Sequence, residues 1–204
     1  MTILHISDTH GFHKQLGRLP ITDIIVHTGD FTSDGTDSEA SDFIQWFCRL
    51  PHKHKVFIAG NHDMCMFGKD GIKGLPENVH YLCNSSMEIE GIKFYGMPMF
   101  MENMMGGVYD MLINAIPDDV NVLLTHQPPY GILDEGEYHG QQDYHYGNSH
   151  LFAKILDVKP TLHFFGHNHN VYGRTERFGI TFSNATIVDE HYDVKEEKYL
   201  MSKI

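Results

Sequence analysis

Five short polar clusters in this chain combine the residue types that bind metal ions. They are SDTHG at 7–11, TGD at 28–30, GNHD at 60–63, THQPP at 125–129 and GHNH at 166–169. Their carboxylates, carboxamide and imidazoles, without a thiol, suit Mn²⁺, Fe or Zn²⁺. The side chains concerned are Asp8, His10, Asp30, Asn61, His62, Asp63, His126, His167 and His169.

This set is larger than the four ligands of one tetrahedral ion, and it fits two ions that share one carboxylate. Two metals about 3.5–4 Å apart can hold a phosphoryl centre between them and activate a bridging water. The pattern therefore indicates phosphoester chemistry.

Each cluster taken alone also has a purely structural interpretation. Gly and Asp are common turn residues, so TGD and GNHD could each form a turn that binds nothing. The pair His167 and His169 could belong to a polar loop, since the chain contains 16 histidines. His5, His27 and His163 lie inside apolar runs and are interpreted as core histidines. The metal interpretation rests on the five clusters together.

Each cluster stands at the end of a short apolar, β-branched run, the pattern typical of a buried strand. These expected strands cover residues 2–7, 23–29, 55–60, 121–126 and 161–167. Ligands of open α/β sheets bind at the carboxyl ends of the strands. If the strands share a sheet, the five clusters meet at that edge.

Helices are expected at 37–50, with Asp37 or Ser38 as the N-cap, and also at 108–116 and 149–160. A strand and then a hairpin turning at Glu90-Gly91 are expected within 79–98, and further short strands at 171–175, 179–184 and 199–203. Strands that alternate with helices and hairpins predict an α/β sandwich.

Two segments could line a substrate cleft. The methionine-rich loop at 97–107 is interpreted either as adaptable packing or as a mobile wall of the cleft. The segment 134–148 is rich in Tyr, His and Gln, and it could stack on a base or form a polar surface loop.

Length and composition indicate one soluble globular domain over residues 1–204, with 41% hydrophobic and 21% charged residues. No apolar run is long enough for a membrane span, and the start of the chain does not resemble a signal peptide. Three cysteines without a CxxC pair favour a reducing compartment, so a cytoplasmic location is expected. The net charge of −12 disfavours duplex nucleic acid as a partner, since binding it requires Lys and Arg at phosphates.

Other phosphate chemistries lack their signatures in the sequence. No GxxxxGK[ST] is present, which disfavours a P-loop. No cysteine is followed six positions later by Arg, and DTH at 8–10 lacks the second Asp of aspartyl-phosphate hydrolases. A metal-dependent reaction is the remaining expectation.

The ordered series Asp8-x-His10, Gly29-Asp30, GNHD at 60–63, His126 and GHNH at 166–169 resembles the signature of the calcineurin-like metallophosphoesterases. HTGDFT (27–32), IAGNHD (58–63), YGMP (95–98), LLTHQPPYGILD (123–134) and HFFGHNHNVYG (163–173) are similar to the small metallophosphoesterase-domain branch related to class III cyclic-nucleotide phosphodiesterases. The resemblance spans residue 5 to about residue 184. It implies a four-layer sandwich of two mixed β-sheets flanked by helices.

The resemblance also implies roles for individual residues. One metal would be held by Asp8, His10, Asp30 and His169, and the other by Asp30, Asn61, His126 and His167. Some members of the branch have Gly in place of the first His of the last motif, which this chain keeps as His167. A metal-bridging hydroxide would attack phosphorus in line, while His62 donates either a proton to the leaving oxygen or a hydrogen bond to the phosphate.

One departure concerns the orientation of His62. Related protein phosphatases carry an Asp three positions after the shared metal ligand, to orient the catalytic His, and this chain has Ser33 there. Asp34 and Asp63 are the alternative orienting groups in the sequence.

The expected function is a phosphoesterase with two divalent metal ions, Mn²⁺ favoured and Fe or Zn²⁺ as alternatives. The expected substrate is a small phosphorylated molecule of the nucleotide type, with phosphodiester hydrolysis favoured over monoester hydrolysis. A phosphoprotein phosphatase, a nuclease and a non-enzymatic scaffold of the same fold are the alternatives.

Overall fold

A computed structural model describes residues 1–138 and 140–204 of the chain. Within these residues the first large sheet has the strand order β13-β1-β2-β3-β4. Its strands β1 to β4 run parallel, and β13 pairs antiparallel with β1. The strands are β1 (Thr2–Ile6), β2 (Ile24–Thr28), β3 (His54–Ile58), β4 (Val79–Tyr81) and β13 (Leu200–Lys203).

The second large sheet has the order β11-β12-β10-β7-β6-β5. Its central strands β12, β10, β7 and β6 are parallel, and β5 and β11 add antiparallel edges. The strands are β5 (Ser85–Ile89), β6 (Ile92–Met97), β7 (Val122–Thr125), β10 (Leu162–Phe165), β11 (Gly173–Arg177) and β12 (Ile180–Asn184). Both sheets are therefore mixed.

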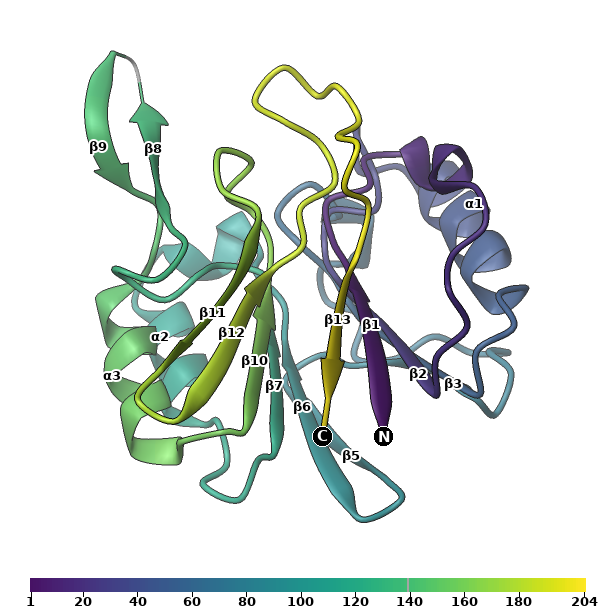
Figure 1. The fold of residues 1–204 in the computed structure, drawn as a ribbon, viewed down its shortest axis with the longest axis horizontal. Helices are drawn as coiled ribbons and strands as arrows, with labels where there is room; N and C mark the ends of the chain where they lie inside the picture. The colour runs from purple at the N-terminus through teal and green to yellow at the C-terminus, as the bar shows by residue number, and fades with distance from the viewer. Residues whose placement is uncertain (139) are drawn as a thin grey trace.

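The two sheets pack face to face, with helices on their outer faces (Figure 1). Helix α1 (Asp37–Cys48) covers the first sheet, and α2 (Val108–Asn114) and α3 (Ser149–Val158) cover the second. Strand alternation explains the layers, since Ile3 joins the hydrophobic cluster between the sheets and Leu4 joins the cluster under α1. The expected four-layer α/β sandwich is confirmed.

The short helical turns η1 (Phe12–Leu16), η2 (Met64–Met66) and η3 (Met101–Met104) lie in the loops after β1, β3 and β6. The expected hairpin turn is present at Glu90 and Gly91, both with positive φ. Within the loop 97–107, Met97 and Met99 pack in the core while Met101 and Met105 are exposed. One part of this segment therefore packs in the core, and another part lies at the surface.

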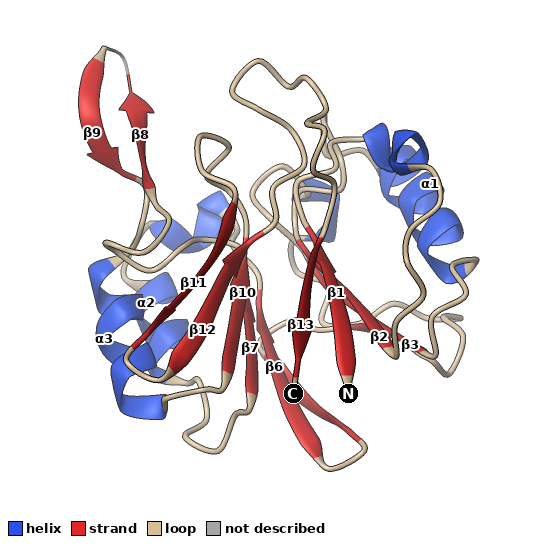
Figure 2. Cartoon of the chain, in the orientation of Figure 1, coloured by secondary structure: helices blue, strands red, loops and turns tan. Residues whose placement is uncertain are grey.

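Two expectations need correction. The segment 134–148 is not a plain polar loop, because β8 (Glu135–Tyr138) and β9 (Gln141–His145) form a hairpin that rises above the carboxyl ends of the sheets (Figure 2). His139, within that segment, lies outside the described residues. The N-cap of α1 is Thr36, which forms a capping box with Glu39 because the pair has the T-x-x-E spacing.

The three histidines expected in the core are buried. His5 bonds to Ser183 and Thr28, His27 bonds to Thr9, and His163 bonds to Thr125. In the described part of the chain, no helix has the length and apolar character needed to cross a membrane.

Candidate metal centre

The predicted site residues follow strands of both sheets and meet where the two carboxyl edges lie together (Figure 1). The clusters after β1, β2 and β3 come from the first sheet, and those after β7 and β10 come from the second. Their ligand atoms gather in overlapping groups within 4.8 Å. These groups are Asp8 with His10 and His169, His10 with Asp30 and His62, and Asp30 with His126 and His167.

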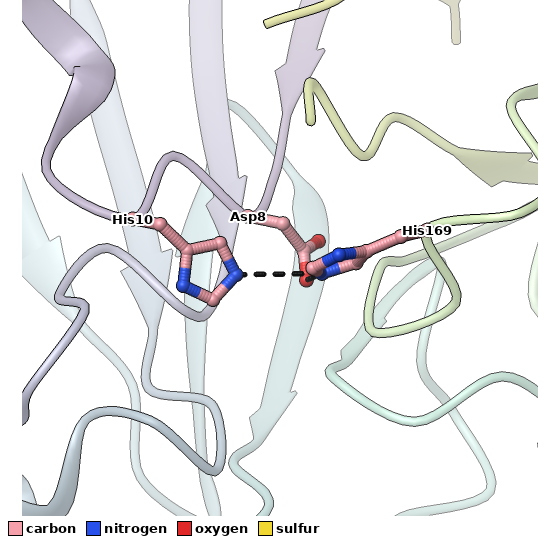
Figure 3. A group of neighbouring side chains, drawn as sticks. All are labelled: Asp8, His10 and His169. Atoms are coloured by element: carbon pink, nitrogen blue, oxygen red, sulfur yellow. Dashed lines mark hydrogen bonds and ion pairs between the residues drawn. The ribbon is translucent and has the colours of Figure 1, made fainter. Parts of the chain in front are cut away.

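The first group joins residues 159 positions apart in the sequence. Nε2 of His169 lies 3.4 Å from Oδ1 of Asp8 and 3.3 Å from Nε2 of His10. The three side chains point toward one another (Figure 3). Asp8 is fixed in place, since its Oδ2 accepts a hydrogen bond from the Thr186 hydroxyl and its carboxylate also accepts one from the main-chain N–H of His167.

The group of Asp30, His126 and His167, here called the second group, is completed by the amide oxygen of Asn61. This Oδ1 lies 3.0 Å from Nε2 of His126 and 2.9 Å from Nδ1 of His167. Nε2 of His126 also lies 3.2 Å from Oδ2 of Asp30. Four side chains from different loops thus bring their donor atoms together.

Asp30 connects the two groups. Its Oδ2 lies 3.2 Å from Nε2 of His126 and 3.8 Å from Nε2 of His10, while its Oδ1 accepts a hydrogen bond from the main-chain N–H of His62. One carboxylate oxygen therefore faces ligand atoms of both groups, and the other is anchored to the protein.

Main-chain carbonyls fix the orientation of two of the histidines. Nδ1 of His126 donates to the carbonyl of Thr28 at 2.8 Å, and Nδ1 of His169 donates to the carbonyl of Asp189 at 3.2 Å. With Nδ1 donating to a carbonyl, Nε2 is the nitrogen of each ring that faces the site. Such outer hydrogen bonds are typical of metal-binding histidines.

The protonation states follow from burial and charge. Burial raises the pKa of Asp30, but the neighbouring His126 outweighs it and lowers that pKa to about 2. Burial lowers the pKa of His10 and of His167, in each case to about 4, so both rings are neutral at pH 7. Burial also lowers the pKa of His126, but Asp30 and Asp8 outweigh it and raise the pKa to about 9. Ionised carboxylates and neutral imidazoles are the forms that bind metals, so a metal at His126 would displace the proton that Asp30 and Asp8 favour on its ring.

The donor set fits two cations. Nε2 of His126 faces the oxygens of Asn61 and Asp30, and Nε2 of His169 faces an oxygen of Asp8. Acceptors that face one another in a buried site repel unless a proton or a cation lies between them. Divalent ions with mixed oxygen and nitrogen coordination satisfy these atoms.

Four of the predicted ligands have left-handed backbone conformations. Their φ values are 54° for Asp8, 40° for His10, 56° for Asp30 and 68° for His167. This region is sparsely populated by non-glycine residues and costs about 1–3 kcal/mol each. Such strain at adjacent loop tips is a property of functional sites and could not be read from the sequence.

Glycines within the motifs allow the loops to approach closely. A Cβ on Gly166 would lie 2.0 Å from Oδ2 of Asp8, and a Cβ on Gly60 would lie 2.2 Å from Oδ1 of Asp30. The glycine at the start of each of these two clusters is therefore required by the carboxylate of another cluster.

His62 lies beside the two groups, and a ring nitrogen of it falls within 4.8 Å of ligand atoms of His10 and Asp30. Its Nδ1 donates to the main-chain carbonyl of Ser33 at 3.0 Å. Ser33 thus orients His62 through its backbone, where Asp34 and Asp63 were the alternatives in the sequence.

Asp63 has a different task. Its Oδ2 accepts hydrogen bonds from the N–H groups of Gly60 and Asp30, both at 2.8 Å, and its Oδ1 accepts from the N–H of Thr32 at 2.9 Å. The buried carboxylate therefore fastens the loop after β2 to the loop after β3. The polar cluster GNHD signalled Asp63, but only the structure reveals this bracing role.

A cavity of about 760 Å³ is lined by residues of the β8–β9 hairpin together with Asn170, Glu190 and His191. Its walls include Glu135, Glu137, Tyr146 and Asn170. The ring centroid of Tyr146 lies 6.2 Å from that of His167, so the cavity adjoins the second group.

Comparisons with known proteins show the family to which the chain belongs. A family model described as calcineurin-like phosphoesterase matches residues 1–171. A UPF0046 protein of Caenorhabditis elegans is 34% identical over 210 residues, which cover 90% of this chain and 74% of that protein. Human metallophosphoesterase domain-containing protein 1 is 31% identical over 220 residues, which cover 92% of this chain and 66% of that protein.

Solved structures support the fold alone, since their sequence identity is low. A phosphopantetheinyl hydrolase from Mycobacterium tuberculosis superposes with a TM-score of 0.63 at 13% identity, covering 98% of this chain and 95% of that one. The protein TT1561 of Thermus thermophilus gives 0.62 at 13% identity, covering 99% and 98%. From the family match, the curated relatives and the clustered ligands, the chain belongs to the calcineurin-like phosphoesterases, in the branch of the metallophosphoesterase domain-containing proteins, and is a metal-dependent phosphoester hydrolase.

Proposed function

We propose that residues 1–204 act as one metallophosphoesterase domain that hydrolyses phosphodiesters of small, nucleotide-type molecules at two divalent metal ions. The observation that carries this proposal is the position of Asp30 Oδ2, which faces His10 on one side and His126 on the other. One ion binds Asp8, His10, Asp30 and His169, and the other binds Asp30, Asn61, His126 and His167. We favour Mn²⁺, with Fe and Zn²⁺ as alternatives, because the donors mix oxygen and imidazole nitrogen.

Two such ions, when bound, lower the pKa of coordinated water and neutralise charge that develops on the phosphoryl oxygens. The protein itself holds the donor atoms at the positions from which they would bind the ions. Hydrogen bonds from the Thr186 hydroxyl to Asp8 and from the His62 amide to Asp30 hold the two carboxylates in place, and Oδ1 of Asp8 and Oδ2 of Asp30 would be the ligand atoms.

His62 is the proton donor in this proposal. Because Nδ1 donates to the Ser33 carbonyl, Nε2 is the nitrogen that exchanges a proton with substrate. Phosphorus gains an oxygen from water and loses the leaving oxygen, which takes the proton from His62 Nε2. A positioned acid of this kind contributes about 10²–10⁴-fold to the rate.

The cavity beside His167 supports a small organic group as part of the substrate. Tyr146 offers an aromatic face at its wall, on which a base could stack. The carboxylates of Glu135 and Glu137 line the same cavity and would repel additional phosphates. We therefore favour substrates with a single phosphodiester over di- or triphosphates.

We also propose a cellular location and a class of partner. Cys48, Cys65 and Cys83 are free thiols, which supports a reducing, cytoplasmic environment. The net charge of −12 supports small substrates over duplex nucleic acid, and we propose no membrane partner.

The test is to strip the purified protein of metal and titrate Mn²⁺ while assaying bis-p-nitrophenyl phosphate beside p-nitrophenyl phosphate, with metal content measured on the same samples. Diester hydrolysis that saturates near two metals per chain supports the proposal and leads to a screen of cyclic and linear nucleotide diesters. Two metals with turnover of the monoester alone would favour a phosphatase. An absence of both bound metal and turnover would favour the alternative of a non-enzymatic scaffold with the same fold.

A further inference from the structure

A tyrosine from outside the matched motifs lies over the candidate centre. The ring centroid of Tyr192 is 4.9 Å from that of His10 and 5.2 Å from that of His169, both in edge-on geometry. It is 6.3 Å from the ring of His62. The family model ends at residue 171, so the match does not cover this residue.

The loop that carries Tyr192 is built around Asp189. Oδ1 of Asp189 accepts hydrogen bonds from the main-chain N–H groups of His191 and Asp193, and the Asp189 carbonyl accepts from the N–H of Tyr192 at 3.0 Å. The same carbonyl accepts from Nδ1 of His169. The position of the Tyr192 ring is therefore tied to that of a predicted metal ligand.

Tyr192 adopts an unfavourable arrangement in two respects. Its φ is 63°, in the left-handed region that bulky residues rarely occupy, and 42% of its surface is exposed. A residue kept in such a conformation at a site indicates a functional constraint, since the surrounding loop must hold it there. Packing alone does not account for an aromatic ring that remains half-exposed above three histidines.

We infer that Tyr192 is a specificity-determining residue whose ring contacts the organic group on the leaving oxygen of the substrate. This inference rests on the proposed function, in which His62 protonates that oxygen. Tyr192 adjoins His62 and His10, whereas Tyr146 adjoins His167. The two tyrosines thus flank different parts of the centre, and Tyr192 lies on the side of the proton donor.

The test compares Tyr192→Ala and Tyr192→Phe with the wild type, each loaded with Mn²⁺. Stacking on an aromatic side chain is worth about 5- to 100-fold in binding, so Tyr192→Ala should raise the KM for bis-p-nitrophenyl phosphate by that factor. Its kcat and metal content should stay within about threefold of the wild type. Tyr192→Phe should restore the KM, because it keeps the ring.

Inhibition assays distinguish the loss of a contact between the Tyr192 ring and the ligand from a general disturbance of the site. Diphenyl phosphate should inhibit Tyr192→Ala more weakly than the wild type by the same factor, whereas inhibition by dimethyl phosphate should be unchanged. Phe178→Ala is the matched control, since Phe178 is also exposed and left-handed, with φ 56°, but sits in the β11–β12 turn at the far ends of the strands.

An unchanged KM in Tyr192→Ala, a parallel loss of metal, or failure of Tyr192→Phe to restore the KM would overturn the inference. A wild-type protein that binds Mn²⁺ but hydrolyses neither ester would refute the proposed function and the inference with it. A wild type that turns over the monoester alone refutes the diesterase proposal, and the same variants then test Tyr192 on p-nitrophenyl phosphate and phenyl phosphate.

Discussion

Gly60 lies so close to the candidate centre that any larger residue at this position would clash with the centre's side chains. An added Cβ would lie 2.2 Å from Oδ1 of Asp30, 2.6 Å from the Asp30 nitrogen and 2.7 Å from Cε1 of His126. An ordinary contact begins near 3.4 Å, so the carboxylate would have to move by about 1.2 Å. Oδ1 is also the atom that accepts the His62 N–H, which ties the shift to the proton donor.

Gly60→Ala should therefore lower kcat/KM by about 100-fold or more, the cost of misplacing a reacting group by about 1 Å. Overpacking should reduce the free energy of unfolding by about 1–3 kcal/mol. Because Asp30 is the proposed shared ligand, Mn²⁺ affinity should fall at both metals. The assays are bis-p-nitrophenyl phosphate kinetics, calorimetric Mn²⁺ titration and urea unfolding of the metal-free protein.

Gly71→Ala is the matched control, because a Cβ there meets nothing within 4 Å and the backbone conformation is ordinary. It should change the free energy of unfolding by less than about 0.5 kcal/mol and leave kcat/KM intact. If Gly60→Ala kept two metals and a kcat/KM within about threefold of the wild type, the close approach of the two loops could not be what positions Asp30.

Three further predictions address the ligands and the loop that carries Ser33. Asp30→Ala should lose both metals and nearly all activity, and full retention of metal by mass spectrometry would break its assignment as the shared ligand. His62→Ala should keep two metals while kcat falls by about 10²–10⁴-fold; loss of metal in that variant would make His62 a ligand instead. Burial raises the pKa of Glu39, but hydrogen bonds from Thr36, Asp34 and Ser33 outweigh it and lower that pKa from 4.5 to about 2. This stabilisation is present above pH 4.5 and is lost as the pH falls toward 2. Because solvent screens this exposed carboxylate, Glu39→Ala should reduce the free energy of unfolding by only about 1 kcal/mol at pH 7, and by less at pH 3. Urea titrations at the two values measure this, and an equal loss at both would exclude the carboxylate as the cause.

Continuous apolar runs were sufficient to predict an α/β sandwich, and the family resemblance implied its four layers. The apolar runs of β1, β2, β3, β7 and β10 are buried on both faces, so each reads as continuous hydrophobic sequence ended by a polar cluster. The β8–β9 hairpin was missed because the sequence of its strands, EGEY and QQDYH, contains no apolar run.

The residues of the candidate centre could also be predicted from the sequence, but the orientation of their side chains could not. The Ser33, Thr28 and Asp189 carbonyls position His62, His126 and His169, and a backbone carbonyl leaves no trace in residue type. Tyr192 was missed for a related reason: its importance follows from a loop conformation fixed by Asp189, with no motif around it.

The strain at the centre explains why its loops are bonded mainly to one another. Asp8 and Asp30 have left-handed backbones in which a strand end turns sharply, and neither conformation would persist in an isolated loop. The N–H of Asp8 donates to the carbonyl of Gly29, and the N–H of His10 donates to that of Asp30. Asp63 then fastens the Asp30 loop to the Gly60 loop. Because each of these bonds joins two of the loops, hydrogen bonds to a neighbouring loop offset the strain at each tip, and a change in one loop should displace the donor atoms of the next.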